Sequence, residues 1–203
     1  MKKFLKKRWP WILGACVVAA ALIFLLARCG NSANSGKPTL TVETPQKLSA
    51  SQTDAFTLDV TVSHLGDALY PAMSMSIAFD ASRLEFLGVE EGNLFILSDE
   101  NSTGQQLPNW SCSVENSNHT GVINIMYLDM TGGRNAFTQA LLAEDDNVVL
   151  RLQFRLRGSA RAGDVLDLIV EDAVFAASDE TQSLAMTTDT LKVKNGRLVI
   201  GES

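Results

Sequence analysis

The stretch that decides the fold is SMSIAFDASRLEFLGVEEGNL, from Ser74 to Leu94. Its first half alternates apolar residues with serine and alanine up to Phe79, which is the period of a half-buried β-strand. At Asp80 the pattern changes to that of a turn, because an aspartate side chain can accept hydrogen bonds from the backbone that follows it. A second alternating run begins at Leu84, which we expect to return to the core. The stretch therefore predicts two strands joined by a tight turn.

Similar short runs, separated by turn residues, extend over the rest of the chain after Pro38. The dipeptide Asn195-Gly196 lies between the last two runs and is typical of a β-hairpin. Only Ala136–Glu144 suggests a helix. About ten short strands with so little helix predict an all-β fold, a two-sheet antiparallel β-sandwich. The expected strands are Thr39–Thr44, Phe56–Ser63, Met73–Asp80, Leu84–Val89, Trp110–Glu115, Val122–Leu128, Val148–Leu156, Val165–Glu171, Ala173–Ala176, Thr190–Lys194 and Arg197–Ile200.

The N-terminal region has the pattern of a membrane anchor. Trp9–Ala27 is an uncharged, mostly apolar run of 19 residues, long enough as a helix to span most of the hydrocarbon core. Five basic residues precede this run and only Arg28 follows it directly, so we expect the N-terminus to stay in the cytoplasm and the rest to be exported. We divide the chain into a basic cytoplasmic flank (1–8), a transmembrane anchor or uncleaved signal (9–28), a flexible linker (29–38) and one folded domain (39–203).

Three fates of this leader remain open from the sequence. An uncleaved anchor is favoured, because no good small-x-small cleavage site follows the apolar run. A lipid-modified Cys29 is a second reading, although Arg28 stands where such a signal has a small residue. Simple cleavage is the third. All three place the folded domain outside the cytoplasm, and the first two keep it at the cell membrane, on the cell surface.

The charge of the exported part limits its partners. From Cys29 onward the chain has 11 basic and 23 acidic residues, a net charge of −12. A domain this acidic lacks the basic stripe that a nucleic acid requires, which excludes nucleic acid as a partner.

We predict no cofactor and no metal site: Glu144–Asn147 could offer oxygen ligands to Ca²⁺, but the spacing of a calcium loop is absent. Cys112 alternates with Trp110 and Val114, which predicts a small buried residue.

Several motifs, in order, resemble those of one family. Phe79-Asp80-Ala81 and Leu84 resemble the Tyr-Asp-Pro-x-x-Leu signature of cohesin domains. GVINIMYLD, VVLRLQFRLRG and NGRLVIG are similar to the middle and closing strands of that family, and begin at Gly121, Val148 and Asn195. The resemblance covers about Leu40 to Gly201. It implies a jelly-roll, cohesin-like β-sandwich and a non-enzymatic module that captures a dockerin-bearing protein, in the setting of polysaccharide degradation.

The resemblance, together with strand alternation, also implies a binding face. In the cohesin arrangement we expect the outward side chains of four strands to share one sheet, with an apolar centre at Met126 and Leu128 and a charged rim. The loop Phe95–Pro108, longer than usual for the family, is the other place where a partner could bind. The expected partner-binding residues are Ser74, Ser76, Ser113, Glu115, Asn124, Met126, Leu128, Asp129, Arg151, Gln153 and Arg155.

Two other functions are alternatives to protein capture. Direct binding of polysaccharide is the alternative, because carbohydrate-binding modules share this fold. Sugar rings stack on aromatic side chains, however, and the domain has only Trp110, Tyr70 and Tyr127 besides phenylalanines at core-facing positions. Catalysis is not expected, since no nucleophile, base and oxyanion donor converge in the pattern.

The distribution of charge around Trp9–Ala27 generates a test of topology. Protease added to intact cells should remove the folded domain, and the protein should fractionate with membranes. Complete protection of the domain in intact cells, with digestion only after lysis, would contradict an exported domain.

Overall fold

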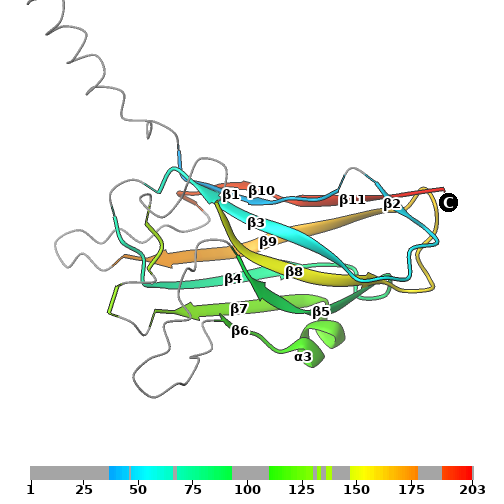
Figure 1. The fold of residues 1–203 in the computed structure, drawn as a ribbon, viewed down its shortest axis with the longest axis horizontal. Coiled ribbons are helices and arrows are strands. Elements are labelled where there is room, and N and C mark those ends of the chain that lie inside the picture. Colours follow the sequence, from blue (N-terminus) through cyan, green and yellow to red (C-terminus); the bar gives the residue numbers. More distant parts are fainter. Residues whose placement is uncertain are drawn as a thin grey trace, which may run out of the picture. The chain divides into compact units, whose positions relative to one another are not determined.

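β-Strands dominate the part of the chain that the computed structural model describes, which comprises residues 37–45, 47–65, 68–92, 110–129, 132–133, 136–138, 147–177 and 189–202 (Figure 1). One short helix, α3, covers Val114–Thr120. The strands are β1 (Thr39–Val42), β2 (Leu48–Ser49), β3 (Phe56–Ser63), β4 (Ala72–Ala78), β5 (Leu84–Glu91), β6 (Trp110–Ser111), β7 (Val122–Leu128), β8 (Val148–Leu156), β9 (Val165–Ala176), β10 (Lys192–Lys194) and β11 (Gly196–Gly201).

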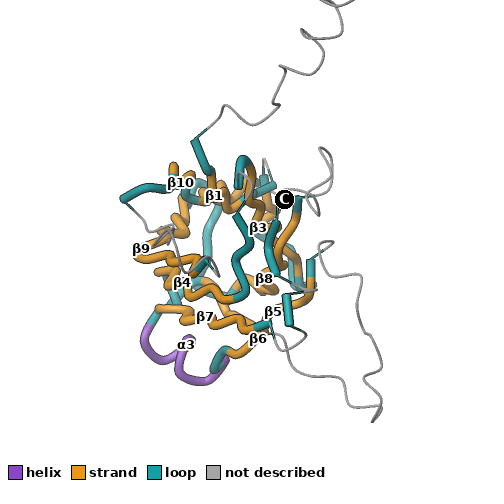
Figure 2. Tube along the Cα trace, turned by 90° about the vertical axis from the view of Figure 1, so that its left-hand side faces the viewer, coloured by secondary structure: helices purple, strands orange, loops and turns teal. Residues whose placement is uncertain are grey.

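The strands form two sheets, which face each other across the core (Figure 2). One sheet has five strands in the order β10-β1-β3-β8-β5, and the other has six in the order β2-β11-β9-β4-β7-β6. Most neighbours are antiparallel, which confirms the two-sheet sandwich. Two pairs, β1 with β10 and β2 with β11, are parallel. These parallel pairs were not expected, and β2 was not predicted at all, because two residues are too few to show a period.

The alternation of buried and exposed side chains along the strands explains why the two sheets pack against each other. In β7 and β4 every second residue is buried, and β8 buries Leu150, Leu152, Phe154 and Leu156. Phe154 lies within 5.5 Å, between ring centroids, of both Phe79 and Phe86. The inward residues of the two sheets therefore share one apolar core, while successive residues point to solvent.

The turn at Asp80 forms as its sequence indicates. The Asp80 carboxylate accepts hydrogen bonds from the Ser82 backbone N–H at 2.9 Å and the Ser82 hydroxyl at 2.5 Å. The hydroxyl bond is the main cause that lowers the pKa of Asp80. Leu84 donates its backbone N–H to the Asp80 carbonyl at 2.9 Å, and its side chain is fully buried. The expected return of Leu84 to the core is confirmed.

Two local predictions were wrong. Trp110–Glu115 is not one strand: β6 ends at Ser111, Ser113 caps α3, and the Ser113 hydroxyl accepts from the Asn116 N–H at 3.3 Å. Asn195-Gly196 does not close a hairpin, because β10 pairs with β1 in one sheet and β11 pairs with β9 in the other. Asn195 instead accepts a hydrogen bond from the Val170 N–H at 3.0 Å.

Other sequence expectations fall partly or wholly outside the described residues. The membrane segment 9–28, the linker up to residue 36, the loop Phe95–Pro108 and the acidic residues 144–146 are in this group. Of the expected helix Ala136–Glu144, only residues 136–138 are described, and Phe137 forms an isolated β-bridge with Tyr70. Among the described residues, no helix has the length and hydrophobicity needed to cross a membrane.

Leu84→Ala tests the core. The side chain is fully buried, so truncation should lower the free energy of unfolding by ~2–5 kcal/mol in chemical denaturation. Leu128→Ala is the matched control, because it makes the same change where the side chain is 52% exposed, and we expect a much smaller loss. Equal losses for the two variants would mean that Leu84 is not a core residue.

Gly196→Ala tests the packing at the point where the chain passes from β10 in one sheet to β11 in the other. A Cβ atom at Gly196 would lie 2.9 Å from Val42 Cγ1 and 3.0 Å from Thr44 Cγ2, so the neighbours must shift. We expect a loss of ~1–3 kcal/mol in unfolding free energy, the usual cost of overpacking a core. Gly158→Ala, where nothing lies within 4 Å of the added carbon, should be nearly neutral. A neutral Gly196→Ala would contradict this close packing.

Candidate binding face

The candidate site is the outer surface of the six-stranded sheet, and we call the outward residues of β9, β4, β7 and β6 the docking face. Strand pairing aligns these residues in rows that run across the sheet. Among the described residues, the docking face includes Ala72, Ser74, Ser76, Ala78, Ser111, Val122, Asn124, Met126, Leu128, Val165, Ile169, Glu171, Asp172, Val174 and Ala176.

One end of the docking face is apolar. Met126 is 61% exposed and Leu128 is 52% exposed, both on β7. Ser74 on β4 is aligned with Met126 on β7 and with Val174 on β9. Ala72, also on β4, is aligned with Leu128 on β7 and with Ala176 on β9. Small residues on β4 therefore leave the Met126 and Leu128 side chains raised above the sheet. Their expected outward direction is confirmed.

The other end of the docking face is apolar as well. Ile169 on β9 is 46% exposed and pairs in register with Ala78, whose partner on β7 is Val122. Val165 extends this patch along β9 and is 48% exposed. Four of the five large apolar side chains that are exposed in the described chain thus lie on the outer surface of this one sheet.

A polar row separates the two apolar ends. Ser76 is aligned with Asn124 on β7 and with Asp172 on β9. The Ser76 hydroxyl donates a hydrogen bond to the Asn124 side-chain oxygen at 2.7 Å. The middle of the face is therefore polar. Along the strands the face changes from apolar to polar and back to apolar.

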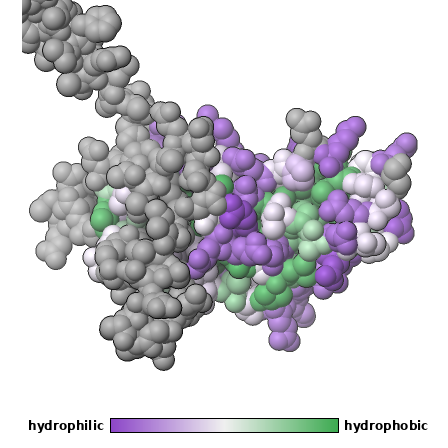
Figure 3. All heavy atoms as spheres, in the orientation of Figure 1, coloured by the Kyte–Doolittle hydropathy of each residue, from purple (hydrophilic) through white to green (hydrophobic). Residues whose placement is uncertain are grey.

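The outer surface of the five-stranded sheet has a different character. Arg151 Nε lies 3.2 Å from Asp59 Oδ1, and Arg155 Nη1 lies 3.4 Å from Glu85 Oε2. Gln153 donates a hydrogen bond to Glu90 at 2.5 Å. Figure 3 views this side, where hydrophilic side chains gather among smaller apolar areas. Its charges pair with one another, so this surface has less need of a partner.

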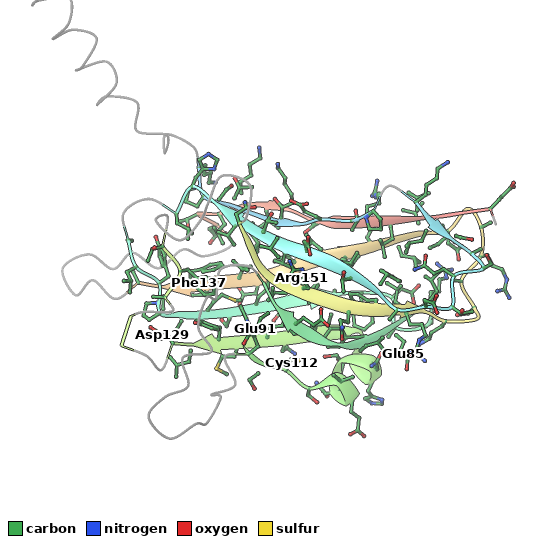
Figure 4. The ribbon with its side chains drawn as sticks, viewed as in Figure 1. Glu85, Glu91, Cys112, Asp129, Phe137 and Arg151 are labelled. Atoms are coloured by element: carbon green, nitrogen blue, oxygen red, sulfur yellow. The ribbon has the colours of Figure 1, made fainter. Side chains whose placement is uncertain are left out.

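The expectation that all candidate residues share one sheet was wrong. Arg151, which Figure 4 labels, lies on β8 of the five-stranded sheet together with Gln153 and Arg155. These three residues therefore cannot form a rim around Met126, which lies on the other sheet. Ser113 and Glu115 belong to the cap and first turn of α3 rather than to a strand. Alternation shows which side of a strand faces out, but it does not show to which sheet the strand belongs.

Asp129 lies at the end of β7 and has a structural role there (Figure 4). Its carboxylate accepts a hydrogen bond from the Gly133 N–H at 2.6 Å, and its own N–H donates to the Pro71 carbonyl at 2.7 Å. Burial, and then the charges of Asp129 and Glu91, raise the pKa of Tyr127. Asp129 therefore stabilises the chain where it leaves the docking face.

Aromatic residues support the docking face from within. The Trp110 and Tyr127 ring centroids are 4.8 Å apart, and Tyr127 lies 4.9 Å from Phe137. Cys112 is half-buried beside this core, and burial raises the pKa of its thiol.

No aromatic residue occupies an outward position on the described strands of either sheet, so those strands offer no platform for sugar stacking. The described residues also contain no group of three or more potential metal ligands.

Strand β9 contributes residues to the docking face that the sequence did not predict there. Ile169, Asp172 and Val174 face outward beside β4, but their strand was predicted as two separate runs with no place in the site. The alternation of exposed and buried residues along Val165–Val170 was the signal that could have revealed it.

Comparison with known proteins identifies the family. A cohesin domain model matches residues 40–194, which is more than half of the chain. The chain belongs to the cohesin domain family. A comparison with curated protein sequences found no match.

Solved cohesin structures share the fold. The OlpA cohesin in a type I cohesin–dockerin complex from Clostridium thermocellum is 17% identical, with a TM-score of 0.59 over 81% of this chain and 99% of that one. The OlpC cohesin from the same organism, also crystallised with a dockerin, is 15% identical, with a TM-score of 0.58 over 82% and 94%. A cohesin module of a family 33 glycoside hydrolase from Clostridium perfringens is 13% identical, with a TM-score of 0.52 over 83% and 98%.

Proposed function

We propose that this cohesin captures a dockerin-bearing protein on its docking face and has no catalytic role. The gathering of the exposed side chains of Met126, Leu128 and Ile169 on the outer surface of one sheet is the observation that carries the proposal. Exposed apolar side chains that cluster on one side of a soluble domain mark a surface that a partner covers. The family membership of the chain and the dockerins bound to two of its structural relatives support a dockerin as that partner.

The contrast between the two sheets supports the choice of surface. On the five-stranded sheet, ion pairs such as Arg151–Asp59 satisfy the outward charges, and a partner would have to break or desolvate them. On the docking face, serine and alanine side chains on β4 let a partner approach closely between the raised apolar residues. Protein interfaces combine a few exposed apolar anchors with polar contacts around them.

The setting of this capture is proposed from the leader sequence. The basic flank before Trp9–Ala27 favours export of the cohesin domain and its attachment to the cell membrane. A membrane-attached cohesin would hold a dockerin-bearing enzyme, such as one that degrades polysaccharide, close to the cell. The protease test of topology checks this part separately from dockerin binding.

Met126→Glu tests the proposed surface. The side chain is 61% exposed and points away from the core, so the unfolding midpoint should change little. A buried carboxylate without a partner is costly, so the dissociation constant for the captured dockerin should rise by about 100-fold or more. Binding of the full-length protein would be measured against each dockerin encoded in the same genome, immobilised in turn.

Thr57→Glu is the control for this experiment. It adds the same charge at an exposed strand position on the outer surface of the five-stranded sheet, and capture should be unaffected. If no dockerin binds the wild-type protein, the proposed function is wrong. If Thr57→Glu abolishes capture while Met126→Glu does not, the function stands but the partner binds the opposite sheet.

A further inference from the structure

Met126 is the most exposed large apolar side chain of the docking face, and its neighbours leave it uncovered. Its exposed fraction is 61%, compared with 52% for Leu128 and 46% for Ile169. On each neighbouring strand Met126 is aligned with a serine, Ser74 on β4 and Ser111 on β6. A serine side chain is too short to cover a methionine thioether. Small oxidants dissolved in water therefore have access to the thioether of Met126.

The other methionines of the described chain are protected from solvent. Met73 and Met75 lie on β4 of the same sheet, but they face inward and are each 2% exposed. Their register partners on β7, Tyr127 and Ile125, are buried as well. The three thioethers have the same intrinsic chemistry, so access of an oxidant to the sulfur atom decides which of them reacts first. Among the described methionines, that residue is Met126.

A peroxide oxidises a thioether without any further reactant. With hydrogen peroxide, the O–O bond breaks, an S–O bond forms, and the other oxygen leaves as water with both hydrogen atoms. The sulfur loses two electrons and the peroxide gains them. The product, methionine sulfoxide, is polar where the thioether was apolar. Reductases return it to the thioether at the expense of two thiols, which become a disulfide while the oxygen leaves as water.

Oxidation of Met126 would change one of the two apolar ends of the docking face. Of the large apolar side chains that the described chain exposes, only Leu128 accompanies Met126 at this end. Asn124, two residues before Met126 on β7, is already polar and accepts a hydrogen bond from Ser76. Burial of a sulfoxide oxygen against an apolar partner costs free energy, because the oxygen loses its hydration. The polar middle of the face would thus extend to Met126 and leave Leu128 alone at this end.

We propose that Met126 is a redox-sensitive modification site, at which oxidation to the sulfoxide by a peroxide prevents capture of the dockerin and reduction restores it. The inference rests on the proposed function and adds a means by which capture is regulated. Export of the domain, proposed from the leader, would expose Met126 to peroxides outside the cytoplasm. A bound dockerin covers Met126, so the free cohesin is the form that reacts.

Partial oxidation of the full-length protein tests this inference within one sample. Hydrogen peroxide is added until part of the Met126 population is converted, and catalase then removes it. The probe is the dockerin that the wild-type protein captures from the set encoded in the same genome. A limiting amount of this dockerin, immobilised, divides the sample into bound and unbound fractions, and peptide mass mapping measures the sulfoxide at each methionine. We expect Met126 sulfoxide to be about tenfold or more rarer in the bound fraction.

The buried methionines and one variant are the controls. Met73 and Met75 should stay reduced while Met126 reacts, because they are 2% exposed. Met126→Leu removes the sulfur and keeps an apolar side chain. Whatever the dissociation constant of this variant before treatment, peroxide should not change it, which also tests the methionines outside the described residues. Reductases for both sulfoxide epimers, supplied with a dithiol, should restore capture to the unbound wild-type fraction.

The outcomes separate this inference from the proposed function. If wild type captures a dockerin but Met126 sulfoxide is divided equally between the fractions, the inference is wrong and the proposed function stands. The same holds if Met73 and Met75 oxidise as fast as Met126, if treated Met126→Leu loses capture as wild type does, or if reduction restores nothing. A lower thermal unfolding midpoint after oxidation of Met126 would also overturn the inference, because the change would not be confined to the docking face. If wild type captures no dockerin, both are wrong.

Discussion

Burial of one face of each sheet against the other is the interaction on which the rest of this structure depends. Leu84, Phe86 and Phe154 from the five-stranded sheet and Ile77, Ile125 and Phe175 from the six-stranded sheet are all essentially removed from solvent. Because strand residues alternate between faces, this packing also fixes which side chains point outward. The inner faces are alike in being apolar. The outer faces are free to differ, and in this protein their difference separates the surface that stays in water from the surface that we expect to be covered.

The difference between the outer faces arises from a few residues on each central strand. On β8, arginines alternate with the buried leucines and find carboxylates on β3 and β5, so the charges on that side neutralise one another. On β4, the corresponding positions hold Ser74, Ser76 and Ala78, which neither rise above the sheet nor carry charge. The flanking strands then supply raised apolar residues. Both sheets alternate inward and outward residues in the same way. Because their outward residues differ, the five-stranded sheet has a polar outer surface and the six-stranded sheet has an outer surface suited to an interface.

Much of this fold could be predicted from the sequence because the strands are long enough to show their period. β7 and β8 have the predicted bounds, and the outward direction of Met126 and Leu128 followed from the same pattern. The sheet to which a strand belongs depends on contacts distant in sequence, which is why Arg151 and Arg155 were placed on the wrong surface. Local signals also failed where tertiary packing opposed them. Asn195-Gly196 has the composition of a hairpin turn, but at Gly196 the chain passes through a site with no room for a Cβ atom.

The central claim is that the outer surface of the six-stranded sheet, rather than that of the five-stranded sheet, meets the partner. The most direct measurement is NMR cross-saturation from a captured, unlabelled dockerin to the full-length cohesin with labelled methyl groups and backbone amides. We predict transfer to the methyl groups of Met126, Leu128 and Ile169, with little transfer to the amides of Thr57, Arg151 and Arg155. Strong transfer to that second group, with the methyl groups of Met126 and Ile169 unaffected, would contradict the account.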